Sequence, residues 1–137
     1  MKFIEYNANP KNKRTGDCVI RAISFATNTK WEIIYRNLAE QGIKKGLMIN
    51  DSKNWKRYLE TLEYEIQKMP RRTNNKRYTL EEFCDEIAED NKTYIVKIAN
   101  HLTVVKNKNL YDTWNCCKKY VGNYWVINDE IWYWVWF

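Results

Sequence analysis

Residues 15–24 read TGDCVIRAIS, and this stretch decides how the rest of the sequence is interpreted. Polar, turn-forming residues lead directly into Cys18, and from Val19 to Ala26 apolar residues recur at positions i, i+3, i+4 and i+7. This spacing predicts a helix that begins at the cysteine. A thiol at the first turn of an apolar helix, two residues after Gly16, is a candidate nucleophile. The alternative is that Cys18 is a small core residue.

Length and composition predict one domain over residues 1–137. The chain is 45% hydrophobic and 15% aromatic, and a chain of this length buries enough surface for a core without disulfides. The formal net charge of +6 favours acidic partners or substrates. We find no signal peptide and no apolar run long enough for a membrane span, so we expect a cytoplasmic protein that does not associate with membranes.

Three further helices are predicted after the one that begins at Cys18. One starts from a capping box formed by Thr29 and Glu32 and ends at Gly42, and another is capped by Asn50 or Asp51. The last starts from a second capping box, which pairs Thr79 with Glu82, and it buries Cys84 on its apolar face.

Strand-like segments dominate the second half of the chain. They are short, β-branched and aromatic, and cover residues 64–69, 93–99, 102–106, 109–114, 123–127 and 130–137. The order of elements predicts an α+β domain, in which the N-terminal helices pack on one side of a C-terminal antiparallel sheet.

A hairpin places the only histidine near an acid. If Asn107 and Lys108 form a two-residue turn, Thr103 faces Asp112, and His101 lies on the same face as a diagonal neighbour of that acid. Trp114 would lie opposite His101 and shield it from water. Asn115 is an alternative orienting residue, but this register puts it on the other face.

These residues together suggest a Cys18, His101 and Asp112 triad. A helix N-terminus and an imidazolium both lower the pKa of a thiol, and a carboxylate can orient the imidazole. The alternatives are that His101 is a hydrogen-bonded strand residue and that Asp112 is a turn or cap ligand. A zinc site of His101, Cys116 and Cys117 matches no common ligand spacing, so we predict no metal and no cofactor.

The combination resembles the papain-like cysteine peptidase superfamily, and most of all its small bacterial and phage branch, which includes the bacteriocin-leader peptidases. In that family a cysteine caps a central helix that packs on an antiparallel sheet, and His and Asn or Asp follow in the order seen for Cys18, His101 and Asp112. The resemblance implies a thiol hydrolase or acyltransferase acting on an amide or isopeptide bond of a protein or peptide. It further implies that Asn12, six residues before Cys18, helps to hold the oxyanion.

Two other segments suggest binding functions. The loop at residues 70–78 carries Arg71, Arg72, Lys76 and Arg77, and we interpret it as a solvated connection rather than a nucleic-acid site. The aromatic stretch IWYWVWF at 131–137 predicts an edge strand through which copies of the chain associate.

Cys116 and Cys117 are expected in an exposed loop. The alternative function is a non-catalytic, host-directed binding protein, encoded by a phage, on the same scaffold.

Overall fold

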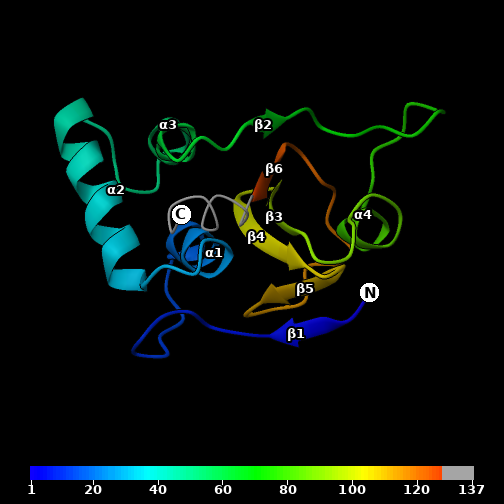
Figure 1. Cartoon of the computed structure of the whole chain (residues 1–137), viewed down its shortest axis with the longest axis horizontal. Coiled ribbons are helices and arrows are strands. Elements are labelled where there is room, and N and C mark those ends of the chain that lie inside the picture. Colours follow the sequence, from blue (N-terminus) through cyan, green and yellow to red (C-terminus); the bar gives the residue numbers. More distant parts are fainter. Residues whose placement is uncertain (128–137) are drawn as a thin grey trace, which may run out of the picture.

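The computed structural model describes residues 1–127 and contains four helices and six strands (Figure 1). In chain order the elements are β1 (Phe3–Glu5), α1 (Cys18–Ala26), α2 (Trp31–Lys45), α3 (Ser52–Thr61), β2 (Ile66–Gln67), α4 (Leu80–Glu86), β3 (Thr93–Ile98), β4 (His101–Lys106), β5 (Asn109–Asp112) and β6 (Tyr124–Ile127). The predicted α+β class is therefore confirmed.

The strands form one sheet in the order β1-β5-β4-β3-β6-β2. Its central pairs are antiparallel, as predicted, but β1 pairs in parallel with β5, so the prediction of a purely antiparallel sheet is wrong. The sequence pattern did not show β1, because three residues are too few to display an alternation of apolar and polar side chains.

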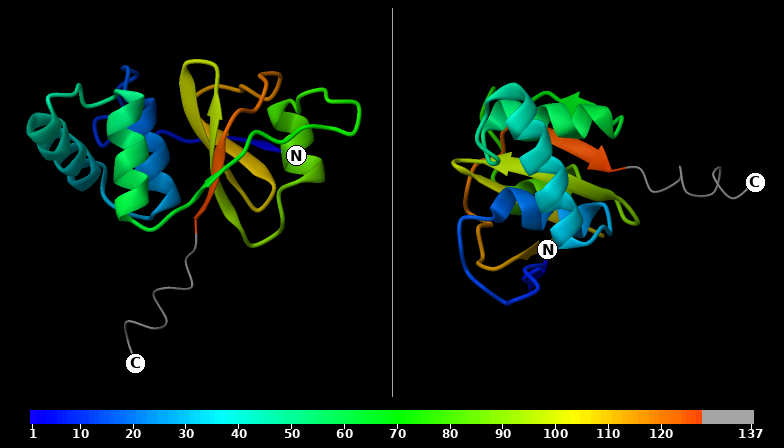
Figure 2. Two further views of the ribbon diagram at one scale, coloured as in Figure 1. Left: turned by 90° about the horizontal axis from the view of Figure 1, so that it is seen from above. Right: turned by 90° about the vertical axis from the view of Figure 1, so that its left-hand side faces the viewer.

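Helices cover both faces of the sheet, so the prediction that they share one face is wrong. The left view of Figure 2 shows α1, α2 and α3 on one side of the sheet and α4 on the other. On the α1 side, Ile23 packs in a cluster with Leu102 and Val104 of β4. On the α4 side, Phe83 packs with Val105 of the same strand, because alternate residues of a strand point to opposite faces.

The ends of α2 differ from the prediction, although α1 begins at Cys18 as expected. The residue that caps α2 is Lys30, because the Thr29 hydroxyl is engaged within the preceding turn, where it donates to the Thr27 carbonyl. The helix ends at Gly46, which has a φ of 68°, rather than at Gly42. At Gly42, a Cβ would lie 2.6 Å from the carbonyl oxygen of Leu47, so close packing explains that glycine.

The other predicted caps are confirmed. Asp51 accepts a hydrogen bond from the backbone of Lys53 at the start of α3, and Thr79 forms both halves of a capping box with Glu82 at the start of α4. Only Ile66 and Gln67 of the strand predicted over 64–69 pair with the sheet, on its outer edge beside β6.

The hairpin between β4 and β5 has the predicted register. Val104 pairs with Tyr111 and Lys106 with Asn109. The turn residues Asn107 and Lys108 both have positive φ values, 52° and 64°, as a two-residue hairpin turn of this kind requires. This register brings the start of β4 to the end of β5.

Two further predictions concern the C-terminal aromatic segment and membrane-spanning helices. The strand expected over residues 130–137, and the self-association attributed to it, lie outside the described residues 1–127. Within those described residues, no helix combines the length and the apolar character needed to cross a bilayer.

Candidate active site

The predicted acid and base form a short hydrogen bond. His101 Nε2 lies 2.6 Å from Asp112 Oδ2, and both side chains are almost completely buried. The hairpin register explains this contact, because β4 begins at His101 and β5 ends at Asp112. Since Nε2 is engaged by the carboxylate, Nδ1 is the ring nitrogen that remains for Cys18.

Other hydrogen bonds fix the Asp112 carboxylate. The Thr103 hydroxyl donates to Oδ2 over 2.6 Å, and the backbone N–H of Thr113 donates to Oδ1 over 2.6 Å. The thiol of Cys116 donates to Oδ2 over 3.8 Å. Burial raises the pKa of Asp112, but the hydrogen bonds with His101 and Thr103 and the charge of His101 outweigh it and lower the pKa. The acid is therefore held ionised.

His101 is correspondingly held in its charged form. Burial lowers the pKa of the imidazole, but hydrogen bonds with Asp112, Cys116 and Cys18 and the charge of Asp112 raise it well above its usual value. The ring of Trp114 lies beside it, with ring centroids 5.2 Å apart. Trp114 follows the end of β5, so it contacts His101 from outside the sheet rather than as a strand partner.

The Cys18 thiol lies at the start of α1, against the start of β4. Burial raises the pKa of this thiol, but hydrogen bonds with His101 and with the backbone N–H of Leu102, together with the charges of His101 and Arg21, outweigh it. The pKa of Cys18 therefore lies below the usual value for a thiol. A thiolate beside an imidazolium is the arrangement that makes a cysteine nucleophilic near neutral pH.

Arg21 connects the start of α1 to Asp112. Arg21 donates to Asp17 over 2.8 Å and to Asp112 over 3.3 Å, and its side chain is mostly buried. Asp17 also accepts hydrogen bonds from the side chains of Asn9, over 3.1 Å, and Trp31, over 3.0 Å. These contacts turn the Asp17 carboxylate away from the helix N-terminus, where it makes no cap hydrogen bond.

Consequently the first turn of α1 keeps backbone N–H groups that can bind an anion. An α-helix leaves its first N–H groups without intrahelical partners, and among the described residues no side chain caps those of α1. The backbone N–H of Cys18 is thus a suitable donor to an oxyanion formed at this thiol.

The structure does not bring Asn12 into this group. Its side chain is exposed, and its amide oxygen accepts a hydrogen bond from Asn7 over 3.4 Å. Among the described contacts, none joins Asn12 to Cys18. A positive φ of 52° places Asn12 in a turn of the loop rather than on an approach to the thiol.

Cys116 and Cys117 are buried, so the expectation that they lie in an exposed loop is wrong. They pack with Cys84 in the apolar cluster beneath α4. A His101 nitrogen, an Asp112 oxygen and the Cys116 sulfur lie within 4.8 Å of one another, and these atom types bind zinc. A metal there would displace the proton between His101 and Asp112, so metal binding and the hydrogen-bonded pair exclude each other.

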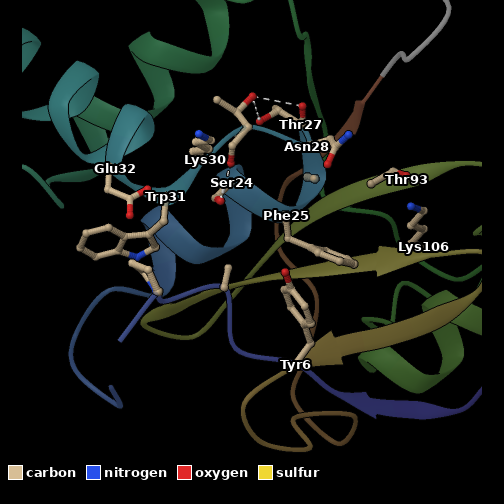
Figure 3. A pocket seen from close by; sticks show the side chains of 14 residues that line it. Tyr6, Ser24, Phe25, Thr27, Asn28, Lys30, Trp31, Glu32, Thr93 and Lys106 are labelled. Carbon is tan, nitrogen blue, oxygen red and sulfur yellow. Dashed lines mark hydrogen bonds between the residues drawn. The ribbon is translucent and has the colours of Figure 1, made fainter. Parts of the chain in front are cut away.

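The largest described cavity lies away from these residues. It has a volume of about 790 Å³ and surrounds the C-terminal end of α1, where Figure 3 shows Phe25 and Tyr6 side by side. None of the predicted triad residues lines it. Cys18 and Asp112 instead line a small hollow of about 20 Å³ beside Arg21.

The sequence analysis did not predict the residues that hold Asp112 and the start of α1 in place. Arg21 stands four positions after Asp17 on a largely apolar helix, and that spacing is the signal that could have predicted an ion pair. No sequence signal predicted that Cys116, four residues beyond Asp112, would turn back toward it.

Comparison with family models, with curated proteins and with solved structures finds no match to this chain. The geometry of the site is therefore the basis for assigning a function.

Proposed function

We propose that this protein is a thiol hydrolase that cleaves an amide or isopeptide bond of a peptide or protein. Cys18 is the nucleophile, His101 the general acid and base, and Asp112 the residue that orients His101. The observation that carries the proposal is the hydrogen-bonded His101–Asp112 pair beside a thiol whose pKa is lowered at the start of a helix. A buried cysteine in an apolar core has no need of these partners.

The first half of the proposed reaction transfers an acyl group to sulfur. The Cys18 thiolate attacks the carbonyl carbon, and the carbonyl π electrons move to oxygen, where the backbone N–H of Cys18 donates a hydrogen bond to the oxyanion. As the intermediate collapses, the C–N bond breaks and the His101 imidazolium gives its proton to the leaving amine. The products of this step are a thioester at Cys18 and a neutral imidazole.

The second half regenerates the thiol site. His101, now neutral, removes a proton from water as the water oxygen attacks the thioester carbonyl carbon. The C–S bond then breaks, which restores the thiolate and the imidazolium. Asp112 stays ionised throughout and accepts the hydrogen bond from Nε2, so it stabilises the charged ring at both stages. An amine acceptor in place of water would give acyl transfer with the same residues.

The arrangement also supports the resemblance to papain-like peptidases. A cysteine begins the helix that packs against β4, and the histidine and the acid come from adjacent strands in the expected chain order. The parallel strand β1 and the position of α4 on the opposite face are the features for which that resemblance does not account.

The test uses a library of tryptic peptides from a bacterial lysate. The native protein should generate new peptide ends, detected by amine labelling and mass spectrometry. Cys18→Ala and His101→Ala should generate none above background, whereas Cys117→Ala, which removes a thiol outside the triad, should retain cleavage. Equal product from native protein and Cys18→Ala would overturn the proposal. An inert native protein with an unreactive Cys18 would favour the non-catalytic binding protein.

A further inference from the structure

A pocket with four cationic side chains lies beside the candidate active site. Its volume is about 550 Å³, and we call it the basic pocket; its lining is Arg77, Lys97, Ile98, Ala99, Lys118, Lys119, Tyr120 and Gly122. No acidic side chain lines it. Such a concentration of like charge is unfavourable unless an anion enters.

The four cations have no acidic partners among residues 1–127. None of Arg77, Lys97, Lys118 and Lys119 takes part in a described ion pair. By contrast, Arg72, which belongs to the same loop as Arg77, is neutralised by Glu82 and Glu86. One cation of that loop is therefore neutralised, whereas Arg77 faces the basic pocket without an acidic partner among the described ion pairs.

The basic pocket adjoins the candidate nucleophile through the sheet. Lys97 of β3 is the strand partner of Leu102 of β4, and Leu102 lines the same small hollow as Cys18. Two residues after Lys97, Ala99 enters the turn that leads to His101. Lys97 is half-buried; burial and the nearby charge of Lys56 lower the pKa of its ammonium, and the charge of Cys18 opposes this shift.

Specific contacts shape the pocket around these charges. The Arg77 guanidinium lies over the Tyr120 ring, 5.5 Å from its centroid, and donates to the Val121 carbonyl over 3.2 Å. The Lys97 ammonium donates to the Ile98 carbonyl over 2.5 Å. Lys118 and Lys119 are exposed. Two cations are thus held by neutral groups, and two are free to approach a ligand.

We infer that the basic pocket binds an acidic side chain of the peptide whose amide bond reaches Cys18. This inference rests on the proposed function and adds the class of substrate. A peptide is favoured over a nucleic acid because the proposed reaction cleaves an amide bond, and because Lys97 of the pocket is the strand partner of Leu102, which lies beside Cys18. Carboxylates satisfy the unpaired cations by charge-assisted hydrogen bonds.

The experiment compares two electrophilic peptides that alkylate Cys18. Chloroacetyl-Glu-Glu-amide and chloroacetyl-Gln-Gln-amide differ only in charge, and mass-spectrometric peptide mapping gives the rate at Cys18 for each. We expect the acidic probe to react about tenfold faster at 50 mM NaCl, and the ratio to fall toward one at 500 mM NaCl, because salt screens exposed charges. K118Q/K119Q should reduce the ratio to about twofold.

A matched variant controls for net charge. K44Q/K45Q removes the same charge from the exposed end of α2 and should keep the ratio of the native protein. A ratio near one in the native protein, or one that K118Q/K119Q leaves unchanged, would overturn the inference while the proposed function stands. Failure of both probes to modify Cys18 would overturn the proposed function as well. Salt-sensitive binding of a 20-nucleotide single-stranded DNA that K118Q/K119Q abolishes, without a preference for the acidic probe, would assign the pocket to nucleic acid instead.

Discussion

The two faces of the sheet each hold a cysteine on a helix, and the two thiols differ in character. Cys18 on α1 is half-buried, and its pKa is lowered. Cys84 on α4 is completely buried, and burial raises its pKa to about 12. Burial opposes ionisation at both sites, so the opposite outcomes come from their partners.

The charged groups near the two thiols differ. At Cys18, an imidazolium, a backbone N–H of β4 and a guanidinium all favour the thiolate. At Cys84, Asp85 and two further thiols oppose the thiolate, and the N-terminal ammonium favours it too weakly to offset them and the burial. A cysteine on an apolar helix is therefore not recognised as reactive by burial alone; the charged groups that face it decide.

Alkylation of the native protein gives the largest contrast between the two faces. At pH 6.5 we expect iodoacetamide to modify Cys18 at least about a thousandfold faster than Cys84, because the thiolate is the reactive form and Cys84 is also inaccessible. Peptide mapping over time measures both rates, and denatured protein, in which both thiols react alike, is the control. Comparable alkylation rates of Cys18 and Cys84 in the native protein would show that the two thiols do not differ in reactivity.

Loss of the arginine that joins α1 to β5 should have the next largest effect. Arg21→Met leaves the buried Asp17 carboxylate without a cation and removes one of the two cations that pair with Asp112, so we expect the free energy of unfolding to fall by about 3 kcal/mol. Arg57→Met, in an exposed pair with Glu60, should cost less than about 0.5 kcal/mol. Urea titrations measure both free energies of unfolding. Similar losses in the two variants would mean that the buried ion pairs of Arg21 contribute no more to stability than the exposed pair of Arg57.

The pH dependence of the free energy of unfolding can reveal an ion pair between the Cys18 thiolate and the His101 imidazolium. If the lowered pKa of Cys18 leaves its folded thiol ionised near pH 8, the unfolded chain binds one proton at Cys18 and His101, on the thiol, and the folded protein also binds one, on the imidazole. The two residues together then contribute no slope to the pH dependence. In Cys18→Ala the raised pKa of His101 acts alone. Its stabilisation is complete below the unfolded pKa of about 6.5 and declines as the pH rises toward the folded value.

The free energy of unfolding of Cys18→Ala should therefore fall by about 2 kcal/mol, relative to that of the native protein, between about pH 7 and pH 8.5. This corresponds to about 1.4 kcal/mol per pH unit. Urea titrations at several pH values give the two slopes, and every group outside the pair cancels in their difference. Parallel slopes would show that no proton moves from Cys18 to His101 on folding.

Removal of the imidazole should make Cys18 more like an ordinary thiol. We expect His101→Ala to slow alkylation of Cys18 about tenfold at pH 6.5, because the thiol is then mostly protonated, although its higher pKa makes the remaining thiolate more nucleophilic. Asp112→Ala should have a smaller effect, since Asp112 acts through His101. The pH profile of the rate should shift upward in both variants. An unchanged profile in His101→Ala would show that the contrast with Cys84 reflects exposure alone.

Asn12 should have the smallest effect. Because its side chain is exposed and contacts Asn7, Asn12→Ala should change cleavage of the peptide library by less than about twofold, against the roughly hundredfold loss typical of a removed oxyanion donor. A large loss with unchanged alkylation of Cys18 would restore Asn12 to the oxyanion site.

The sequence was most informative where local rules apply. The hairpin register follows from a two-residue turn, so the contact between His101 and Asp112 could be predicted from alternation alone. The start of α1 at Cys18 followed from helical periodicity. The split of helices between the two faces could not be derived, because it depends on a long connection that carries the chain from α3 to α4.

The groups that tune the site were harder to predict. Arg21 reaches Asp112 across 91 positions of sequence, and no local pattern encodes such a contact. Asn12 was inferred from its spacing to Cys18, but a loop with positive φ at that position directs its side chain elsewhere. Spacing predicts a side-chain position only when the residues between are in regular structure.

The turn at Asn107 and Lys108 also bears on the order of assembly. Only 11 positions separate His101 from Asp112, and a short hairpin closes within microseconds because its loop entropy is small. Cys18 belongs to the N-terminal part of the chain and leaves the ribosome long before that hairpin. During synthesis the thiol therefore keeps its ordinary acidity, and it acquires its ionising partners only when the C-terminal strands have been made and the distant segments dock.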